Sequence, residues 1–446
     1  MTSRSVSSWF GTYEPRSINP VQRKRVAEIV EHDLRELSLG RFPIAAEPIT
    51  VPLSSYRDLL EATRRLMELQ HTAISNLAPD RHGRMVALKA DPADFPRFTD
   101  DEPFEMRHAA DVARADVMIC QSGPQFIEFN VGAGVGGMLT FELQRRFWQR
   151  VRAEADEPPL TGVDLFEQLA RVITRTAAEL GIAPSALLIG TLDDPGKSQR
   201  NFDLQIDLLQ QFGVQARFAD LRDLRELTGP AGGIANAVGV VQFSENEANA
   251  RGWDMSSLVT AVKAGLTAVP SQSARLMDSK KVLALLSEGL PWMSRDDLEL
   301  VRRYVPWSRV VGDRPVEWRG HRYNLPRLLI ERQECFVLKG AAGLSAQEVF
   351  FGATLSDREW KDLVHEATES EYYVAQETVT PVLHPVQMML DESGRTETVL
   401  ANSVISPFCL GGVPAGCHVR FDTVIGPGPV SRDSGARLGC LLGAAR

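Results

Sequence analysis

Helix-forming and strand-forming segments alternate between residues 164 and 243, and this alternation constrains the fold more than any other feature of the chain. Helices are predicted at residues 164–180 and 200–212, each ended by a glycine. Strands are predicted at residues 186–189, 214–218 and 237–243. Strands that are joined through helices pair in parallel, so the pattern predicts a small Rossmann-like sheet covered by helices. Such a layer says little about function.

The sequence on either side of this segment has a different character. An amphipathic helix is predicted at residues 56–74, where apolar residues three and four apart share one face, and a further helix at residues 20–38. From residue 271 onward the pattern becomes α+β. We therefore expect three parts, 1–160, 161–270 and 271–446, which agrees with the roughly two to four domains that a chain of this length suggests.

Composition excludes some classes of function. The formal net charge is −9 and the pI about 5.5, which argues against a nucleic-acid binder, because such proteins carry a basic face. No apolar run reaches the roughly 18 residues of a transmembrane helix, and the first residues lack the apolar core of a signal peptide. Five scattered cysteines without a CxxC pair suggest reduced thiols in the cytoplasm. We expect no nucleic-acid or membrane partner, whereas a homo-oligomer is compatible with the sequence.

Residues 187–198 follow a predicted strand and end in Gly-Lys-Ser, which invites comparison with a phosphate-binding loop. That motif has four residues between its glycines, and here five residues separate Gly190 from Gly196. Asp193 and Asp194 would also lie against the phosphate. We therefore interpret the segment as a strand-to-helix connection made of turn residues.

Two short apolar segments, residues 115–120 and 125–131, are separated by turn residues and predict a β-hairpin. Because side chains alternate between the two faces of a strand, Glu128 and Asn130 share one face while their apolar neighbours share the other. A carboxylate and an amide are hard oxygen ligands, which suit a magnesium ion that also binds phosphate oxygens. The alternative is that these polar side chains lie on the solvent face of an edge sheet.

Asp116, on the first strand of this hairpin, joins the polar face only under one condition. It lies opposite Glu128 or Asn130 if the turn has an odd register or contains a bulge, for which Gly123 is available. The second strand runs into a glycine-rich segment, residues 132–137, where the backbone can approach a ligand closely. This combination favours a ligand site, with a flexible loop as the alternative.

Further polar residues that suit a nucleotide follow much later in the chain. Lys339 ends a strand predicted at residues 334–339 and precedes a loop of small residues. A point positive charge beside backbone N–H groups suits a phosphate. A strand is also predicted at residues 372–376, and Gln376 and Glu377 at its end can hydrogen-bond an adenine edge, although an ordinary strand end looks the same.

A helix is predicted to start at Asp278, which would cap it. Lys280 and Lys281 lie in its first turn, where a cation opposes the helix dipole. An unfavourable position for positive charge suggests a local function for these lysines. The alternative is a solvated first turn.

Taken together, these segments resemble a known family. The stretch from Arg114 to Asn130 contains Arg-x-Asp, then Glu-x-Asn, then glycines, and resembles the metal-binding end of ATP-grasp ligases such as D-alanine–D-alanine ligase. Residues 337–343 resemble their lysine strand and glycine-rich loop, and residues 373–377 resemble the strand that leads to their adenine hinge. In ordinary ATP-grasp enzymes the lysine strand comes first. The reversed order resembles the circularly permuted group, which includes natural-product peptide ligases and relatives of glutathionylspermidine synthetase.

The resemblance implies an α+β and α/β architecture, with a circularly permuted ATP-grasp fold and a Rossmann-like pre-ATP-grasp domain. It implies ATP and Mg²⁺ as cofactors, and it makes Arg114 the catalytic residue that contacts the transferred phosphate or the tetrahedral intermediate. The metal ligands that it implies are Asp116, Glu128 and Asn130. The nucleotide-binding residues that it implies are Lys281, Lys339, Gly343, Gln376 and Glu377.

The reaction that the resemblance implies is ATP-dependent amide formation between a small-molecule or peptide carboxylate and an amine, through an acyl phosphate. Such an enzyme is an ADP-forming carbon–nitrogen ligase. The chain departs from the family in two places: the loop after Lys339 carries Ala346 and Glu348 in place of glycines, and Asn130 is followed by Val-Gly and not by Pro-Gly. Two other classes stay open, a phosphotransferase with the same ATP site and a nucleotide-binding module without catalysis.

Overall fold

The computed structural model describes most of the 446-residue chain. The described residues are 9–11, 44–154, 156–194, 196–228, 234–342, 348–391, 393–423, 430 and 435–445. The helix predicted at residues 20–38 lies outside them. Among the described helices, none combines the length and the apolar character that crossing a membrane requires.

The largest sheet has eight strands and supplies one wall of the site. Its strand order is β1-β15-β16-β17-β18-β2, and the hairpin β3–β4 joins it through β16. The strands are β1 Ile44–Ala45, β2 Ile49–Pro52, β3 Val112–Cys120, β4 Gly123–Val131, β15 His384–Met389, β16 Thr396–Leu410, β17 Val413–Asp422 and β18 Arg437–Ala444. Strands from both ends of the chain therefore form one sheet, and β16 pairs with β3 antiparallel.

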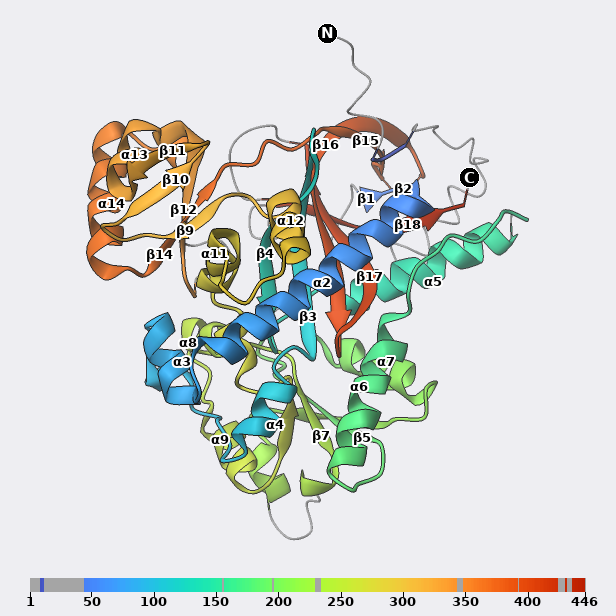
Figure 1. Ribbon diagram of the computed structural model, residues 1–446. Helices are drawn as coiled ribbons and strands as arrows, with labels where there is room; N and C mark the ends of the chain where they lie inside the picture. Colours follow the sequence, from blue (N-terminus) through green and yellow to red (C-terminus); the bar gives the residue numbers. More distant parts are fainter. Residues whose placement is uncertain are drawn as a thin grey trace.

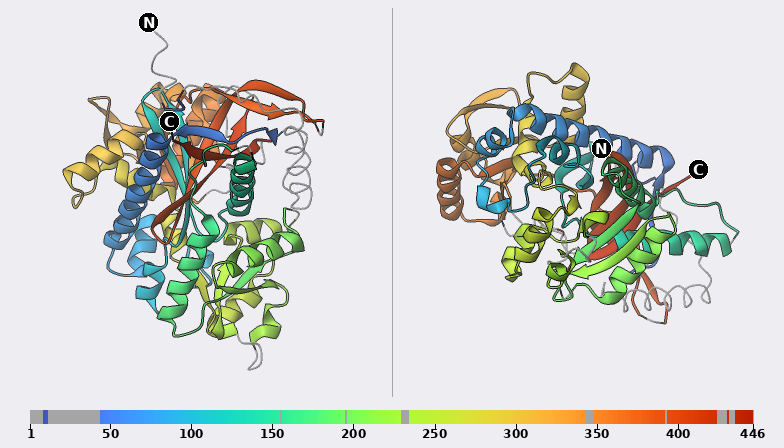
Figure 2. Two further views of the ribbon diagram at one scale, coloured as in Figure 1. Left: turned by 90° about the vertical axis from the view of Figure 1, so that its right-hand side faces the viewer. Right: turned by 90° about the horizontal axis from the view of Figure 1, so that it is seen from below.

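Helices cover both faces of this sheet (Figures 1 and 2). The long helix α2, Leu53–Leu77, crosses one face and is the helix predicted from its apolar stripe, extended by about one turn at each end. The other face carries α5, Met138–Glu154, and α6, Leu165–Glu179. Gly416 of β17 is needed there, because a Cβ atom at this position would lie 1.9 Å from the ring of Phe141.

The predicted Rossmann-like layer is confirmed as a four-stranded parallel sheet of order β6-β5-β7-β8. Its elements are β5 Ser185–Gly190, α7 Gln199–Gln210, β6 Gln215–Asp220, β7 Val238–Val241, α8 Glu245–Arg251, α9 Ser256–Lys263 and β8 Thr267–Val269. The segment that ends in Gly-Lys-Ser is a strand-to-helix connection, as interpreted. Lys197 Nζ donates to the carbonyl of Gln242, and Ser198 forms a capping box with Asn201 at the start of α7.

A third, antiparallel sheet of order β13-β12-β14-β9 faces the hairpin β3–β4. Its strands are β9 Ser308–Val310, β12 Phe336–Gly340, β13 Val349–Phe351 and β14 Tyr373–Glu377, so both strands predicted in this region exist. A small hairpin and two helices complete this unit: β10 Pro315–Trp318, β11 His321–Asn324, α13 Leu325–Glu331 and α14 Asp357–Ser370. In Figure 1 the unit lies beside the large sheet, at the upper left.

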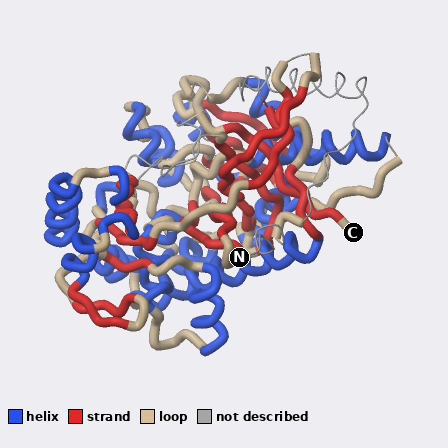
Figure 3. Tube along the Cα trace, turned by 90° about the horizontal axis from the view of Figure 1, so that it is seen from above, coloured by secondary structure: helices blue, strands red, loops and turns tan. Residues whose placement is uncertain are grey.

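The remaining helices connect these sheets: α3 Arg81–Leu88, α4 Glu102–Arg107, α10 Ala274–Met277, α11 Lys280–Glu288 and α12 Arg295–Tyr304. Seen from above, the largest group of strands runs through the middle of the molecule with helices beside it, and further strands lie at the lower left (Figure 3). The division into three parts at residues 160 and 270 stays a prediction, since the large sheet takes strands from both outer parts.

Candidate functional site

The hairpin β3–β4 places Asp116 opposite Glu128 by means of a β-bulge. Its turn contains two residues, because Cys120 pairs with Gly123. Farther along, Val117 pairs with Phe126 and Asp116 pairs with Glu128, so one residue of β4, Ile127, has no partner in β3. The expected bulge therefore exists, although it lies at Ile127 and not at Gly123.

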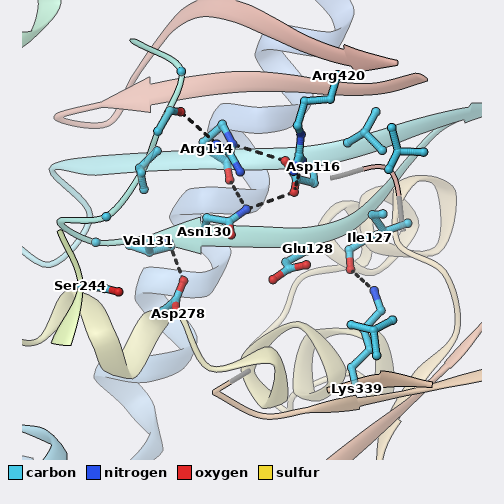
Figure 4. A pocket seen from close by; sticks show the side chains of 18 of the residues that line it. Arg114, Asp116, Ile127, Glu128, Asn130, Val131, Ser244, Asp278, Lys339 and Arg420 are labelled. Carbon is cyan, nitrogen blue, oxygen red and sulfur yellow. Dashed lines mark hydrogen bonds and ion pairs between the residues drawn. The ribbon is translucent and has the colours of Figure 1, made fainter. Parts of the chain in front are cut away.

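The bulge leaves the carbonyl of Ile127 facing the third sheet, where Lys339 reaches it (Figure 4) and a second side chain also binds it. Lys339 Nζ donates to this oxygen over 3.0 Å, and Gln376 Nε2 donates to it over 3.3 Å. Lys339 comes from β12 and Gln376 from β14. Two segments far apart in the sequence, predicted separately as metal-binding and phosphate-binding, are thus in direct contact.

Asp116 is buried among partners that bind both of its carboxylate oxygens. Its Oδ2 lies 2.5 Å from Arg420 Nη2 and accepts from Asn130 Nδ2, while its Oδ1 lies 3.3 Å from Arg114 Nε and accepts from Ser406 Oγ. Burial alone would raise the pKa of this carboxyl group, but the two guanidinium groups hold the pKa well below its usual range. Asp116, which was predicted to bind the metal, therefore forms ion pairs with two arginines instead.

Glu128 and Asn130 share one face of β4, as predicted, and both line the cavity. Asn130 Nδ2 donates to Asp116 Oδ2 over 3.3 Å and to the Arg114 carbonyl over 3.4 Å, so the amide oxygen is the atom left for a ligand. Glu128 Oε1 lies 3.0 Å from Lys280 Nζ. Among the described residues, no three His, Cys, Asp or Glu side chains come together in a way that would hold a metal ion without further ligands.

Lys281, predicted to bind phosphate, points elsewhere. Its Nζ donates to the carbonyl of Leu88 over 2.7 Å, and Lys280 takes the place beside Glu128. Consecutive side chains of a helix point about 100° apart, so only one of the two lysines can lie beside Glu128. The predicted cap is also absent: α11 begins at Lys280, and Asp278 Oδ1 accepts the backbone N–H of Val131 over 2.8 Å.

The predicted adenine-binding pair divides into two different roles. Gln376 lines the cavity, but its side chain is buried and its amide is bound to Lys339, Ile127 and Ser308. Glu377 lines the cavity, and its Oε1 accepts from Arg319 Nη2 over 2.6 Å. Gly343 lies outside the described residues.

One cavity of about 910 Å³ joins these groups. Its end between β12, β13 and the segment after β14 has apolar walls, formed by Val337, Val349 and Phe351. Its middle contains the charged groups of the hairpin and Lys339. Its far end is formed by the glycine-rich segment and by the start of α8, where a Cβ atom on Gly134 would lie 3.1 Å from the backbone nitrogen of Ser244.

Several cavity residues that were not predicted from the sequence come from β16 and β17: Asn402, His418 and Arg420. Burial and the neighbouring Arg114 and Arg420 lower the pKa of His418 to about 3, so its imidazole is neutral at physiological pH. A signal for β17 did exist. Polar and apolar residues alternate from His418 to Asp422, which is the pattern of a strand with one polar face.

No protein-family model and no curated protein sequence matches the chain. Among solved structures, it is similar to a glutathione synthetase-like effector from Globodera pallida, with a TM-score of 0.58 and 13% sequence identity, covering 96% of this chain and 98% of the other. It also matches a protein named as a gamma-glutamylcysteine synthetase from Methylobacillus flagellatus, at 13% identity over 90% of each chain. That TM-score, 0.41, is too low to establish a shared fold. By the first match, the chain has the overall fold of a glutathione synthetase-like protein.

Proposed function

We propose that this chain is an ATP- and magnesium-dependent ligase with a circularly permuted ATP-grasp site, which joins a carboxylate to an amine. The observation that carries the proposal is the contact between Lys339 and the bulge of β4, because it brings a phosphate-binding lysine to the strand that bears Glu128 and Asn130. The glutathione synthetase-like fold supports it. The proposed partners are small-molecule or peptide acids and amines.

The cavity suits ATP in both shape and charge. The apolar end, with Val337 and Phe351 as walls, accommodates an adenine ring, and Glu377 at its edge suits ribose hydroxyl groups. Lys339 lines the cavity between this end and the hairpin, where it meets the phosphates in the proposed complex, and Lys280 lies 3.0 Å from Glu128, another residue of the cavity wall. We therefore propose that Lys280, and not Lys281, is the lysine of α11 that acts at this site, because Lys280 lies beside Glu128 whereas Lys281 is bound to the carbonyl of Leu88.

The donor set also fits magnesium that arrives with a nucleotide. Glu128 and Asn130 supply a carboxylate and an amide oxygen on one face, and magnesium commonly takes only one or two carboxylates from the protein, with phosphate oxygens and water completing its shell. Asp116 is left out of the proposed shell because both of its oxygens are bound by arginines, Ser406 and Asn130. When bound, magnesium neutralises charge on the phosphate oxygens.

In the proposed reaction, a carboxylate oxygen of the acid attacks the γ-phosphorus, and the bond to the bridging oxygen of ADP breaks. The amine nitrogen then attacks the acyl carbon, phosphate leaves, and the amine loses a proton. Asp116 holds the guanidinium groups of Arg114 and Arg420 side by side at the cavity wall. There they neutralise negative charge on the transferred phosphoryl group and on the tetrahedral oxyanion.

Replacing Lys339 by methionine tests the phosphate contact. We expect Lys339→Met to weaken ATP binding about 30-fold, because a charge-assisted hydrogen bond is lost while the volume of the side chain is kept. Isothermal titration calorimetry measures the change. Lys281→Met is the matched control, since Lys281 points to Leu88, and it should bind ATP as the wild type does. Equal affinities in all three proteins would exclude Lys339 from the site.

The protonation of Lys339 gives a second test. Burial, with Lys280 nearby, lowers the pKa of Lys339 to about 8, so about half of these lysines are neutral at pH 8 in the free protein. A bound polyphosphate favours the ammonium and raises the pKa, so ATP binding should take up roughly half a proton at pH 8 and much less at pH 6.5. Calorimetry in two buffers of different ionisation enthalpy measures the uptake. Lys339→Met should abolish most of it, and an uptake that persists in this variant would contradict the assignment.

A screen of acids and amines separates the proposed reaction from its alternatives. The protein is mixed with ATP, magnesium and amino acids or short peptides, singly and in pairs, and ADP is measured. A ligase releases ADP at full rate only when both an acid and an amine are present. A phosphotransferase needs one acceptor, and a nucleotide-binding module binds ATP without release. ADP release that depends on a single acceptor, or on none, would overturn the proposed function.

A further inference from the structure

The side chains of Lys339 and Gln376 leave the same face of the antiparallel pair β12–β14. Gln376 pairs with Val337, which lies two residues before Lys339, so the two long side chains are diagonal neighbours on one face. Both are buried, with exposed fractions of 6% for Lys339 and 3% for Gln376. Each must therefore find its hydrogen-bond partners inside the protein.

These two side chains and the carbonyl of Ile127 are all hydrogen-bonded to one another. Lys339 Nζ donates to Gln376 Oε1 over 2.8 Å and to the Ile127 carbonyl over 3.0 Å, and Gln376 Nε2 donates to the same carbonyl over 3.3 Å. Gln376 Nε2 also donates to Ser308 Oγ over 3.1 Å, and this hydroxyl donates to the Pro306 carbonyl. Since its nitrogen has two acceptors, the amide has a single orientation in which its oxygen faces the ammonium group.

We propose that Gln376 is a positioning residue for Lys339, which holds the ammonium group at the phosphate-binding part of the cavity without contacting the nucleotide itself. This inference rests on the proposed function, because it takes Lys339 to bind the phosphates of ATP. It replaces the role at the adenine edge that the sequence suggests for Gln376. The two roles predict different losses when the side chain is changed.

The chemistry of the two acceptors supports a positioning role. A carbonyl and an amide oxygen are neutral, so they stabilise the ammonium group and leave its charge for an anion. A carboxylate in the same place would stabilise it more strongly but would cancel that charge. Lys280 shows the contrast, because its Nζ lies 3.0 Å from Glu128 Oε1. Of these two lysines, Lys339 is the one with neutral partners in the described hydrogen bonds.

Calorimetry on the wild type, Gln376→Met, Lys339→Met and the double variant tests the proposal with two probes, ATP and adenosine. We expect Gln376→Met to weaken ATP binding about tenfold and to change adenosine binding by less than about twofold. In the Lys339→Met background, Gln376→Met should weaken ATP binding by no more than about twofold, because the group that Gln376 positions is gone.

Two further variants keep the result interpretable. Gln168→Met replaces another buried glutamine, in α6 and away from the cavity, and should leave both affinities unchanged. Ser308→Ala frees the amide of Gln376 to rotate while keeping its packing, and should reproduce the selective loss of ATP affinity at about two- to threefold. If Gln376→Met does not fold, Ser308→Ala carries the test.

The proposal is overturned if Gln376→Met weakens adenosine as much as ATP, or if its effect on ATP is undiminished in the Lys339→Met background. These outcomes are separate from the failure of the proposed function. A protein that shows the coupling but never releases ADP is not a ligase, yet Gln376 still positions Lys339. If the protein acts as a ligase but Gln376→Met and Lys339→Met weaken ATP binding independently of each other, this inference alone is overturned. If the protein binds no ATP, both proposals are overturned.

Discussion

Glu128→Gln is expected to lower magnesium-dependent ADP release about 1000-fold, which corresponds to about 4 kcal/mol of transition-state stabilisation. The substitution keeps the size of the side chain but removes its charge and replaces one oxygen by an amide nitrogen. A magnesium ion that takes only two ligands from the protein depends strongly on the charged one. The same change also leaves Lys280 without the carboxylate that lies 3.0 Å from its Nζ. The rate of ADP release at saturating ATP, with an active acid–amine pair, measures the effect.

The control for Glu128→Gln shows whether the rate falls because a metal ligand is lost or because any ion pair is lost. Glu371 lies 2.6 Å from Lys89 Nζ on the surface and does not line the cavity. Glu371→Gln should therefore leave ADP release unchanged. Titration with magnesium adds a second readout, because Glu128→Gln should raise the concentration needed for half-maximal rate. Full activity of Glu128→Gln at wild-type magnesium concentrations would remove Glu128 from the metal site.

Asp116→Asn is expected to lower the free energy of unfolding by about 3–5 kcal/mol. The reason is the burial of two cations: Arg420 and Arg114 both lie against this carboxylate, and the variant removes the negative charge that holds them together. Because the pKa of Asp116 is lowered in the folded protein, the stability it supplies is present above the ordinary pKa of an aspartate and is lost as the pH falls below it. Urea denaturation at neutral pH measures the loss.

Asp391→Asn provides the matched control for this stability effect. Asp391 lies 3.1 Å from Arg395 at the surface, where an ion pair contributes about 0.5 kcal/mol or less. If Asp116→Asn were no less stable than Asp391→Asn, the carboxylate of Asp116 would not be needed to hold the two arginines. If Asp116→Asn were stable but had lost magnesium-dependent ADP release, Asp116 would be a magnesium ligand after all.

The parts of the site that could be predicted are those that depend on sequence patterns only a few residues long. The hairpin, the polar face of Glu128 and Asn130, and the strand that ends in Lys339 are visible because alternation and turn residues act within a few positions. The sequence predicts a bulge in this hairpin but not its position at Ile127. The bulge is stabilised there by Lys339 and Gln376, which are remote in sequence. Local sequence does not report such partners.

Other features required the three-dimensional structure. Strands β16 and β17 pair with each other and with β3, so Arg420 reaches Asp116 through contacts that no local pattern specifies. Lys280 and Lys281 are adjacent residues of the same type, so the sequence does not distinguish them. Only the packing of α11 decides which one faces Glu128. Gln376 looks like a strand-end residue in the sequence, and its orientation follows from the neighbouring Ser308.

Transfer of oxygen from the acid to phosphate tests the central proposal most directly. An acid that gives ADP with an amine is labelled with ¹⁸O in its carboxylate, and the released phosphate is analysed by mass spectrometry. Attack of the carboxylate on the γ-phosphorus, followed by departure of phosphate from the acyl carbon, carries one labelled oxygen into each phosphate. We therefore expect singly labelled phosphate in a one-to-one ratio with ADP. Unlabelled phosphate, or label found in AMP, would contradict an acyl phosphate and with it the proposed ligase.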